Sequence, residues 1–246
     1  KRQGCGCLDT CGFEKDAFYF YKSVWNQKEK FAYLCPHWNL KLKKGTVLPV
    51  ICYTNCEDAE LFVNGRSFGM KSKGFPCYGM TERYGHFDRY RRPANTDDLF
   101  LSWDVPYEPG KIEVVGYHDG KEVCRYNVET TGEAAAIKLT VDKTSVDADG
   151  RSVVQAEVRI LDSEGHLVFD ACPELNFTLE GDGEIIGIDN GDPACHEQWK
   201  ETKGRHAFNG MAYAVIRAGQ NKGELKLTVT SSDNTLTNAS VTIQVG

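Results

Sequence analysis

The sequence lacks any apolar run close to the roughly 18 to 20 residues that a membrane-spanning helix requires. Its 246 residues are 41% hydrophobic and 26% charged, which is the composition of a globular protein. The net charge is −6, so the sequence also lacks the basic face that a nucleic-acid partner requires. The one basic cluster, at residues 83–92, is interleaved with aromatic and flanked by acidic residues. We therefore expect neither a membrane span nor a nucleic-acid partner.

The beginning of the chain lacks both a methionine and the apolar segment of a signal peptide. We therefore expect a mature or truncated product. The sequence also lacks a glycine-rich phosphate loop, a Ser/His/Asp order and a C-x-x-C redox pair. Residues 189–192 (DNGD) lack the spacing of an EF-hand loop, so they indicate a tight turn rather than a calcium site. We expect no cofactor and no metal site.

Ten cysteines are more than usual, and seven of them lie within the first 77 residues. Their spacing begins as C-x-C-x3-C and continues as isolated residues, which differs from the C-x2-C or C-x4-C pairs of zinc sites. This spacing favours small buried side chains with free thiols, while disulfides and zinc stay open as alternatives. Cysteine usage therefore does not identify the compartment.

One segment near the N-terminus has the periodicity of a helix. Residues 13–25 place aromatic side chains near helical spacing, among them Phe18, Tyr21 and Trp25. Gly12 and the polar residues 26–30 indicate its two ends. So aromatic a face requires a large partner surface, and the strand-rich remainder of the chain does not supply one. We interpret this helix as the end of a domain that lies mostly upstream.

From about residue 46 the pattern changes to short strands separated by turn residues. The predicted strands cover residues 47–53, 58–63, 99–105, 111–117 and 122–128. The strand at residues 58–63 runs into Asn64-Gly65, which is a strong hairpin signal. This spacing predicts a small antiparallel sandwich. Residues 70–98 form a long interruption rich in Gly, Tyr and Arg, and loops of that length are usually functional or disordered.

A second series of strands begins near residue 135, after a short joint. Apolar and polar residues alternate along several segments, most regularly along residues 239–245. The series predicts an immunoglobulin-like sandwich of about seven strands. The predicted fold is therefore all-β, with two immunoglobulin-like β-sandwiches in tandem preceded by one helix. The expected boundaries are 1–32 for the helical segment, 33–132 for the first sandwich and 133–246 for the second.

Several strings resemble those of a known family, and they occur in its order. They are residues 9–16 (DTCGFEKD), 35–39 (CPHWN), 53–65 (YTNCEDAELFVNG) and 103–110 (WDVPYEPG), followed by 147–150, 189–193 and 208–210. Together they resemble the C-terminal part of glycoside hydrolase family 2, the β-galactosidase and β-glucuronidase family. The resemblance implies that residues 1–32 are the last helix of a (β/α)8 catalytic barrel. It also implies that residues 133–246 form the family's terminal invasin-like sandwich.

The resemblance implies that the chain carries no catalytic residue. This family hydrolyses terminal β-linked sugars with retention, using one carboxylate as acid/base and another as nucleophile. In relatives both carboxylates lie on barrel strands upstream of the matching region, and no Glu or Asp here matches either. Glu14 and Asp16 are the nearest by position, but they lie at a helix start, where acidic residues interact favourably with the helix dipole. We expect the chain alone to be inactive.

Five residues are candidates for substrate contact. The Trp38 indole could stack on a sugar ring, with His37 and Asn39 hydrogen-bonding hydroxyls. Tyr84 and Tyr90, in the long interruption, combine aromatic rings with nearby arginines, which suits sugars or subunit contacts. The structural alternatives are a tryptophan that fills a domain junction and a loop that covers a sandwich edge. Trp25 is expected to pack, and Trp199 is a weaker candidate.

These observations favour a non-catalytic C-terminal fragment of a retaining glycoside hydrolase with a β-galactosidase-like parent. Its expected partners are the missing barrel of the same polypeptide and the parent's oligo- or polysaccharide substrate, and a homo-oligomer stays open. We expect a periplasmic or secreted protein. The alternative from a different class is an independent carbohydrate-binding or adhesion module.

Overall fold

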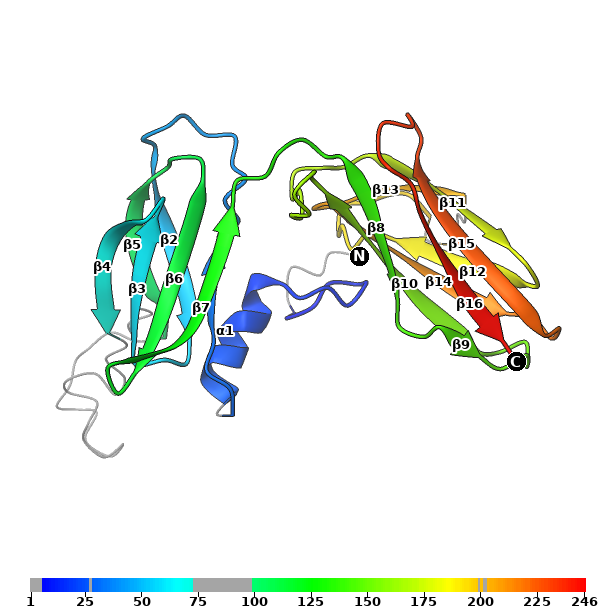
Figure 1. Cartoon of the computed structure of the whole chain (residues 1–246), viewed down its shortest axis with the longest axis horizontal. Helices are drawn as coiled ribbons and strands as arrows, with labels where there is room; N and C mark the ends of the chain where they lie inside the picture. The colour runs from blue at the N-terminus through cyan, green and yellow to red at the C-terminus, as the bar shows by residue number, and fades with distance from the viewer. Residues whose placement is uncertain (1–5, 27, 73–98, 199, 201–202) are drawn as a thin grey trace. The chain divides into compact units, whose positions relative to one another are not determined.

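The computed structural model describes residues 6–26, 28–72, 99–198, 200 and 203–246 (Figure 1). Two compact units divide the chain: one comprises residues 14–130, the other residues 1–13 and 131–246. Each unit contains one β-sandwich, and the chain has one helix among its described residues. The prediction of an all-β chain with two sandwiches and an N-terminal helix is confirmed. No helix in the described ranges is long and apolar enough to cross a membrane.

The helix, α1 (Asp16–Trp25), lies within the predicted segment 13–25 and begins three residues later than its first aromatic residue. Asp16 occupies the first turn, where its charge favourably meets the helix dipole. The helix ends at Trp25, and the Asn26 N–H still donates to the Lys22 carbonyl oxygen. α1 belongs to the same compact unit as the first sandwich, against whose strands β1 (Ala32–Cys35) and β2 (Val47–Thr54) it packs.

The first sandwich consists of two antiparallel sheets. One has the order β1-β2-β5, where β5 is Leu101–Pro106. The other has the order β4-β3-β6-β7 and comprises Arg66–Ser72, Asp58–Val63, Lys111–His118 and Lys121–Glu129. Burial alternates along β3, with Ala59, Leu61 and Val63 buried, as expected for a strand with one face on the core. The predicted strands of this half of the chain are confirmed.

The Asn64-Gly65 hairpin joins β3 to β4 as predicted. Asn64 and Gly65 take φ values of 49° and 79°, the positive values that a two-residue hairpin turn requires. The Asn64 side chain also ties this turn to the next one, because its Oδ1 accepts the Lys111 N–H at 2.8 Å and its Nδ2 donates to the Pro109 carbonyl at 3.1 Å. Asn64 therefore stabilises both its own hairpin turn and the turn before β6.

We expect Asn64→Ala to destabilise the first sandwich by about 1 to 2 kcal/mol in urea denaturation, because it loses both side-chain hydrogen bonds and the tolerance of asparagine for positive φ. Asn234 has a similar φ of 55° in the turn after β15 (Gly223–Ser231) and provides the control. Asn234→Ala isolates the backbone cost and is expected to cost less. Equal costs for the two variants would contradict a bridging role for Asn64.

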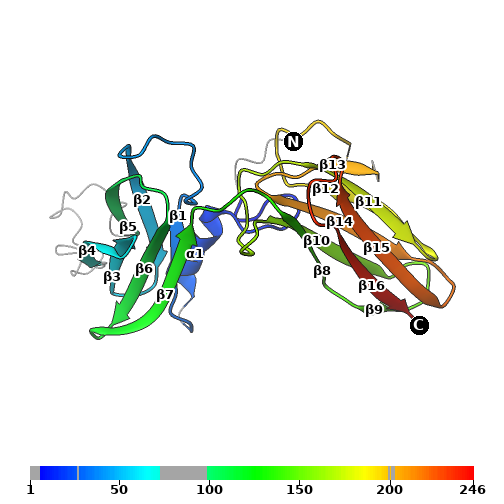
Figure 2. The same ribbon diagram turned by 45° about the horizontal axis from the view of Figure 1, so that its top comes forward.

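The second sandwich has nine strands in the described part of the chain, where about seven were expected. One sheet has the order β12-β14-β10-β8, and the other has the order β13-β11-β15-β16-β9. Their bounds are β8 Ala136–Val141, β9 Ser145–Val146, β10 Val153–Leu161, β11 Glu174–Glu180, β12 Gly183–Asp189, β13 Gly204–His206, β14 Met211–Ala218 and β16 Ala239–Val245. The two sheets of this unit face each other in both views (Figures 1 and 2). The surplus reflects β9 and β13, which have only two and three residues.

One apolar core fills each sandwich. In the second, Ile160, Ile216 and Leu227 are buried between the two sheets, together with side chains from β11 and β16. In the first, Trp103, Leu61 and other side chains of the two sheets form the core around β2, β3 and β5. All eight described cysteines are free thiols, and three of them are buried.

Candidate functional site

The structure places the predicted contact residues His37, Trp38 and Asn39 in the connection between β1 and β2. The Trp38 side chain is only 1% exposed, and its ring lies 5.2 Å from that of Tyr107. Its Nε1–H donates to the Glu108 carbonyl oxygen at 2.9 Å. His37 and Asn39 are half-buried, and the Asn39 N–H donates to His37 Nδ1 at 3.3 Å. The indole therefore fills the core of the first sandwich, and substrate contact by these residues stays a prediction.

The other two predicted contact residues, Tyr84 and Tyr90, lie outside the described residues. The same holds for Trp199 and for the basic cluster at residues 83–92. Of the long interruption at residues 70–98, only 70–72 are described, and they belong to β4. Substrate or subunit contact by Tyr84 and Tyr90 therefore stays a prediction.

An exposed aromatic face lies on α1. Trp25 is 72% exposed and stacks on Tyr21, with ring centroids 4.8 Å apart, and Val24 beside them is also exposed. The opposite face of the helix contacts the first sandwich, where the Tyr19 ring stacks on Tyr33 at 3.6 Å. Within the described residues Trp25 stays largely exposed because the sandwich covers only one side of the helix, and packing of Trp25 against an upstream domain stays a prediction.

The acidic residues at the helix start interact with tyrosines of the same unit. The Tyr19 hydroxyl donates to the Glu14 carboxylate, and the Tyr33 hydroxyl donates to Asp16 at 2.8 Å. Burial raises the pKa of Tyr33, and the nearby Asp16 charge raises it further, so this phenol stays protonated. Both carboxylates therefore anchor α1 to side chains around it, which is a structural role.

A cavity of about 660 Å³ lies against the second sandwich. Its lining comes from the N-terminal segment, β12, β14 and the long connection after β12, and includes Thr10, Cys11, Ile188, Asp192, Glu197 and Tyr213. The N-terminal segment folds tightly here, since the Asp9 carboxylate accepts the N–H groups of Cys11 and Phe13 at 2.8 and 2.9 Å. Burial raises the pKa of the Cys11 thiol to about 12, and the Asp189 and Asp9 charges add to the rise. Cys11 is thus a neutral thiol.

The DNGD segment at residues 189–192 lies at one wall of this cavity. The buried Asn190 side chain donates to the His206 carbonyl and accepts the Asp192 N–H, while the Asp192 carboxylate accepts the Ala194 N–H. A Cβ at Gly191 would lie 2.1 Å from the Asp9 carboxylate, so glycine permits the close approach of the N-terminal segment. These side chains shape the start of the long connection from β12 to β13, so the expectation of a tight turn between strands is wrong.

Arg205 anchors the connection between β12 and β13 from within the second sandwich. Its side chain is 1% exposed, and its guanidinium donates to the carbonyl oxygens of Ile188 at 2.7 Å, Glu197 at 3.0 Å and Gln198 at 2.8 Å. Its Nη1 also lies 3.4 Å from the Glu197 carboxylate. Burial alone would raise the pKa of the Glu197 carboxyl, but the hydrogen bonds from His206 and Cys195 and the Arg205 charge together lower it. No sequence pattern indicates this buried cation.

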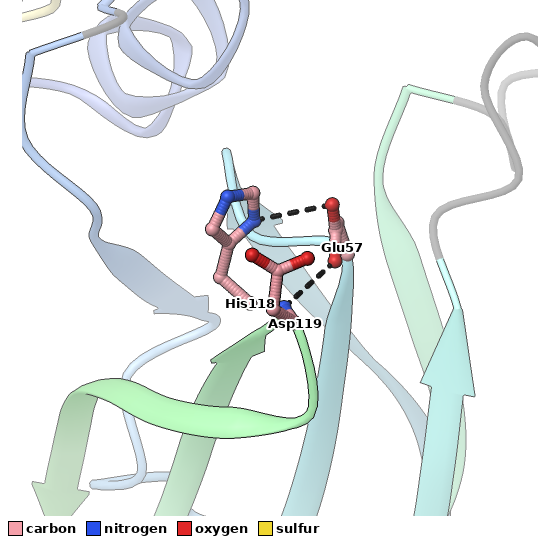
Figure 3. A group of neighbouring side chains, drawn as sticks. All are labelled: Glu57, His118 and Asp119. Carbon is pink, nitrogen blue, oxygen red and sulfur yellow. Dashed lines mark hydrogen bonds and ion pairs between the residues drawn. The ribbon is translucent and has the colours of Figure 1, made fainter.

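A group that could offer ligands to a metal ion lies at one end of the first sandwich (Figure 3). One ligand atom each from Glu57, His118 and Asp119 lies within 4.8 Å of the others. Glu57 is already engaged, since its carboxylate lies 3.2 Å from His118 Nδ1 and accepts the Asp119 N–H at 3.0 Å (Figure 3). Asp119 has a φ of 50° in the turn between β6 and β7. The group is exposed and stabilises this turn, so we assign it no ion.

Two thiols meet beside this group. The Cys56 and Cys124 sulfurs lie 3.5 Å apart, although 68 residues separate them in the sequence. The hydrogen bond from the Cys124 thiol lowers the pKa of Cys56 against the opposite effect of burial. The same bond raises the pKa of Cys124, and burial adds to it. Sequence spacing could not reveal this pair, because the strand pairing of β6 with β3 and β7 brings it together.

The direction in which the pKa values of the acidic residues shift can be compared with the direction that a glycosidase general acid requires. Seven described carboxyl groups have a shifted pKa, and each is lowered: Glu108, Glu113, Asp149, Asp162, Asp182, Glu197 and Asp233. In Asp149, for example, the N–H groups of Ser152 and Arg151 hold the pKa down. A glycosidase general acid requires a raised pKa instead. None of these seven shifts has the direction that this acid requires.

Comparison with protein families matches both sandwiches. The model described as glycoside hydrolase family 2 C-terminal domain 5 matches residues 137–242, and a domain of unknown function, DUF4982, matches residues 45–124. The chain is 37% identical to the β-galactosidase BoGH2A of Bacteroides ovatus over 92% of its own length. It is a C-terminal region of glycoside hydrolase family 2.

Other relatives of this family 2 region agree. A putative β-glucuronidase of Formosa agariphila is 31% identical over 87% of the chain. A crystal structure of a β-glycosidase from Bacteroides vulgatus superimposes with a TM-score of 0.81 over 98% of the chain, at 30% identity. The chain spans only 24%, 19% and 28% of the lengths of BoGH2A, the F. agariphila relative and the B. vulgatus structure. The resemblance read from the sequence strings is therefore confirmed.

Proposed function

We propose that this family 2 region is the non-catalytic C-terminal part of a retaining glycoside hydrolase and that it supports the parent's catalytic domain. The relatives are three to five times longer than the chain, so most of each relative lies outside the matched region. The structural roles of Glu14 and Asp16 support the non-catalytic role.

The observation that carries the proposal is the exposed aromatic face of α1. Tyr21, Val24 and Trp25 expose large apolar surfaces side by side, and contiguous apolar patches on a folded unit usually mark a contact surface. The opposite face of the same helix packs against the first sandwich. The occupant that we propose for the exposed face is the catalytic domain of the same polypeptide, which would make α1 a connecting element between that domain and the first sandwich.

We propose a β-galactosidase-like activity for the parent, acting on terminal β-linked sugars of oligo- or polysaccharides. BoGH2A, the relative with 37% identity, carries the name β-galactosidase, which favours this activity over that of the β-glucuronidases at 31% and 29% identity. The chemistry would follow the two-carboxylate retaining mechanism, with both carboxylates supplied by the catalytic domain.

A chimera tests the support role. BoGH2A truncated before the region that matches this chain is expected to lose most of its activity on a chromogenic β-galactoside, because the apolar contact surface of its catalytic domain is left uncovered. Fusing the present chain in place of the removed region is expected to restore at least a tenth of the activity. The matched control is the same chimera with Trp25→Asp, which puts a charge into the proposed contact and is expected to remain inactive.

Full activity in the truncated enzyme would contradict the support role. Turnover of the chromogenic substrate by the purified chain itself would contradict its non-catalytic nature, and we expect none. The same preparation also tests the independent binding module: micromolar affinity of the isolated chain for β-linked oligosaccharides in calorimetry would favour that function over support of a catalytic domain.

A further inference from the structure

The contact between Cys56 and Cys124 depends on a glycine that lies between them. Cys56 precedes β3, Cys124 lies on β7, and Gly116 of the intervening strand β6 pairs with Cys124 across the sheet. A Cβ at Gly116 would lie 2.6 Å from the Cys124 sulfur and 2.7 Å from the Cys56 sulfur, closer than real atoms approach. Glycine at this position therefore leaves the space in which the two thiols meet.

The surroundings hold one sulfur in place and leave the other within reach. Cys56 is only 2% exposed, and its N–H donates to Thr54 Oγ1, whose hydroxyl donates to the Phe31 carbonyl. Cys124 is half-buried and so can meet a small reagent. The sulfurs are 3.5 Å apart, and a disulfide requires about 2.05 Å. Closure of the disulfide would bring the two sulfurs about 1.5 Å closer together.

We propose that Cys56 and Cys124 are a redox modification site that closes into an intramolecular disulfide by exchange with a low-molecular-weight disulfide. The Cys124 thiol passes its proton to Cys56 through the contact between the two sulfurs, and the Cys124 thiolate so formed attacks the reagent disulfide, forms a mixed disulfide and releases one reagent thiolate. The Cys56 thiolate then attacks the Cys124 sulfur, forms the protein disulfide and releases the second reagent thiolate. The two protein thiols lose two electrons, and the reagent disulfide gains them. The one proton of the pair passes from Cys56 through solvent to a released thiolate.

The closed pair would staple β7 to the segment that precedes β3. The bond would close a loop of 68 residues within the first sandwich. A loop of this length strongly restricts the unfolded chain, so oxidation is expected to raise the melting temperature of the first sandwich by roughly 5 to 15 °C. The second sandwich serves as an internal reference, because its transition should not move.

The test is to treat the whole chain with graded ratios of oxidised to reduced glutathione, alkylate the remaining thiols under denaturing conditions and map the peptides. We expect a Cys56–Cys124 link that forms at a more reducing ratio than any other and that dithiothreitol reverses. Cys172, which is exposed, is the matched control. It should take up glutathione as a mixed disulfide, and Cys172→Ser should leave the link unchanged.

Two variants keep the outcome decisive. Gly116→Ala is expected to slow formation of the link at least tenfold at an unchanged circular dichroism spectrum. If that variant does not fold, Cys124→Ala decides instead, because it should keep Cys56 alkylatable at every ratio. The proposal is overturned if Cys124 stops at the glutathione adduct, if Cys56 links to Cys52 instead, or if both thiols remain reduced while Cys172 reacts.

Discussion

Replacing Arg205 by methionine is expected to destabilise the second sandwich by about 3 kcal/mol, one of the two largest losses that we predict for a single side chain here. Methionine is shorter than arginine, keeps an apolar stem and donates no hydrogen bond. Three carbonyl oxygens, of Ile188, Glu197 and Gln198, would lose their donor beside a closed core. Each buried acceptor left without a partner costs on the order of 1 to 3 kcal/mol, and entry of water into the loosened connection recovers part of it.

The loss should be local as well as global, because Arg205 joins β13 to the connection that follows β12. Hydrogen exchange of peptides from residues 189–198 is expected to accelerate more than that of β10 peptides. Urea denaturation followed by circular dichroism gives the free-energy change. The stability of Arg205→Lys is expected to lie between that of Arg205→Met and that of the unsubstituted chain, since one ammonium group cannot reach all three carbonyl oxygens from a single position.

Arg217→Met is the matched control, because Arg217 lies on β14 of the same unit. Its guanidinium pairs with Glu184, but both side chains are about half exposed. Surface ion pairs of this kind contribute about 0 to 1 kcal/mol, so this variant should remain close to the unsubstituted chain. A similar loss in the two arginine variants would contradict the anchoring role of Arg205.

The buried anchoring role of Arg205 could not be predicted from the sequence, whereas much of the fold could. The long strands of both sandwiches were predictable because alternation of apolar and polar residues is a local signal, and Asn64-Gly65 identified its hairpin through backbone preference alone. Arg205 lies on a three-residue strand, and its acceptors are carbonyl oxygens, which any residue could supply. Nothing in the side-chain pattern therefore distinguishes it from an exposed arginine.

The tryptophans show the same division between local and tertiary information. The helical spacing around Trp25 predicted α1, but not that the indole would remain exposed, which depends on how much of the helix the sandwich covers. Conversely, Trp38 was a candidate for sugar stacking because its neighbours are polar. Burial against Tyr107 is decided by β5 and the loop after it, about 70 residues further along the chain. The local pattern of residues therefore predicts neither the exposure of Trp25 nor the burial of Trp38.

The second large effect is expected for Trp38→Ala, which should destabilise the first sandwich by about 3 to 5 kcal/mol, the range for truncation of a large buried aromatic side chain. The substitution removes the largest fully buried side chain among the described residues and leaves the Glu108 carbonyl oxygen without its donor. The Thr130 hydroxyl donates to the Trp38 carbonyl oxygen, so the joint at the end of β7 should loosen with it. Urea denaturation measures the loss.

Trp38→Phe separates packing from the hydrogen bond, because it keeps much of the apolar volume and removes the Nε1–H. We expect it to cost about 1 to 3 kcal/mol, less than the alanine variant. Trp25→Ala is the control for loss of an indole in the same unit. Trp25 is exposed, so the isolated chain should change by no more than about 0.5 kcal/mol.

The two Trp38 variants also separate the two roles considered for Trp38. If the indole is structural, its removal lowers stability, while a fused BoGH2A catalytic domain keeps its KM for the β-galactoside at temperatures where the alanine variant is still folded. If it contacts substrate, KM rises in both Trp38 variants, and the phenylalanine variant, which can still stack on a sugar, is the less affected. Burial of the indole favours the first result, since a ring enclosed by the first sandwich presents no face to a sugar. A rise in KM without loss of stability would contradict it.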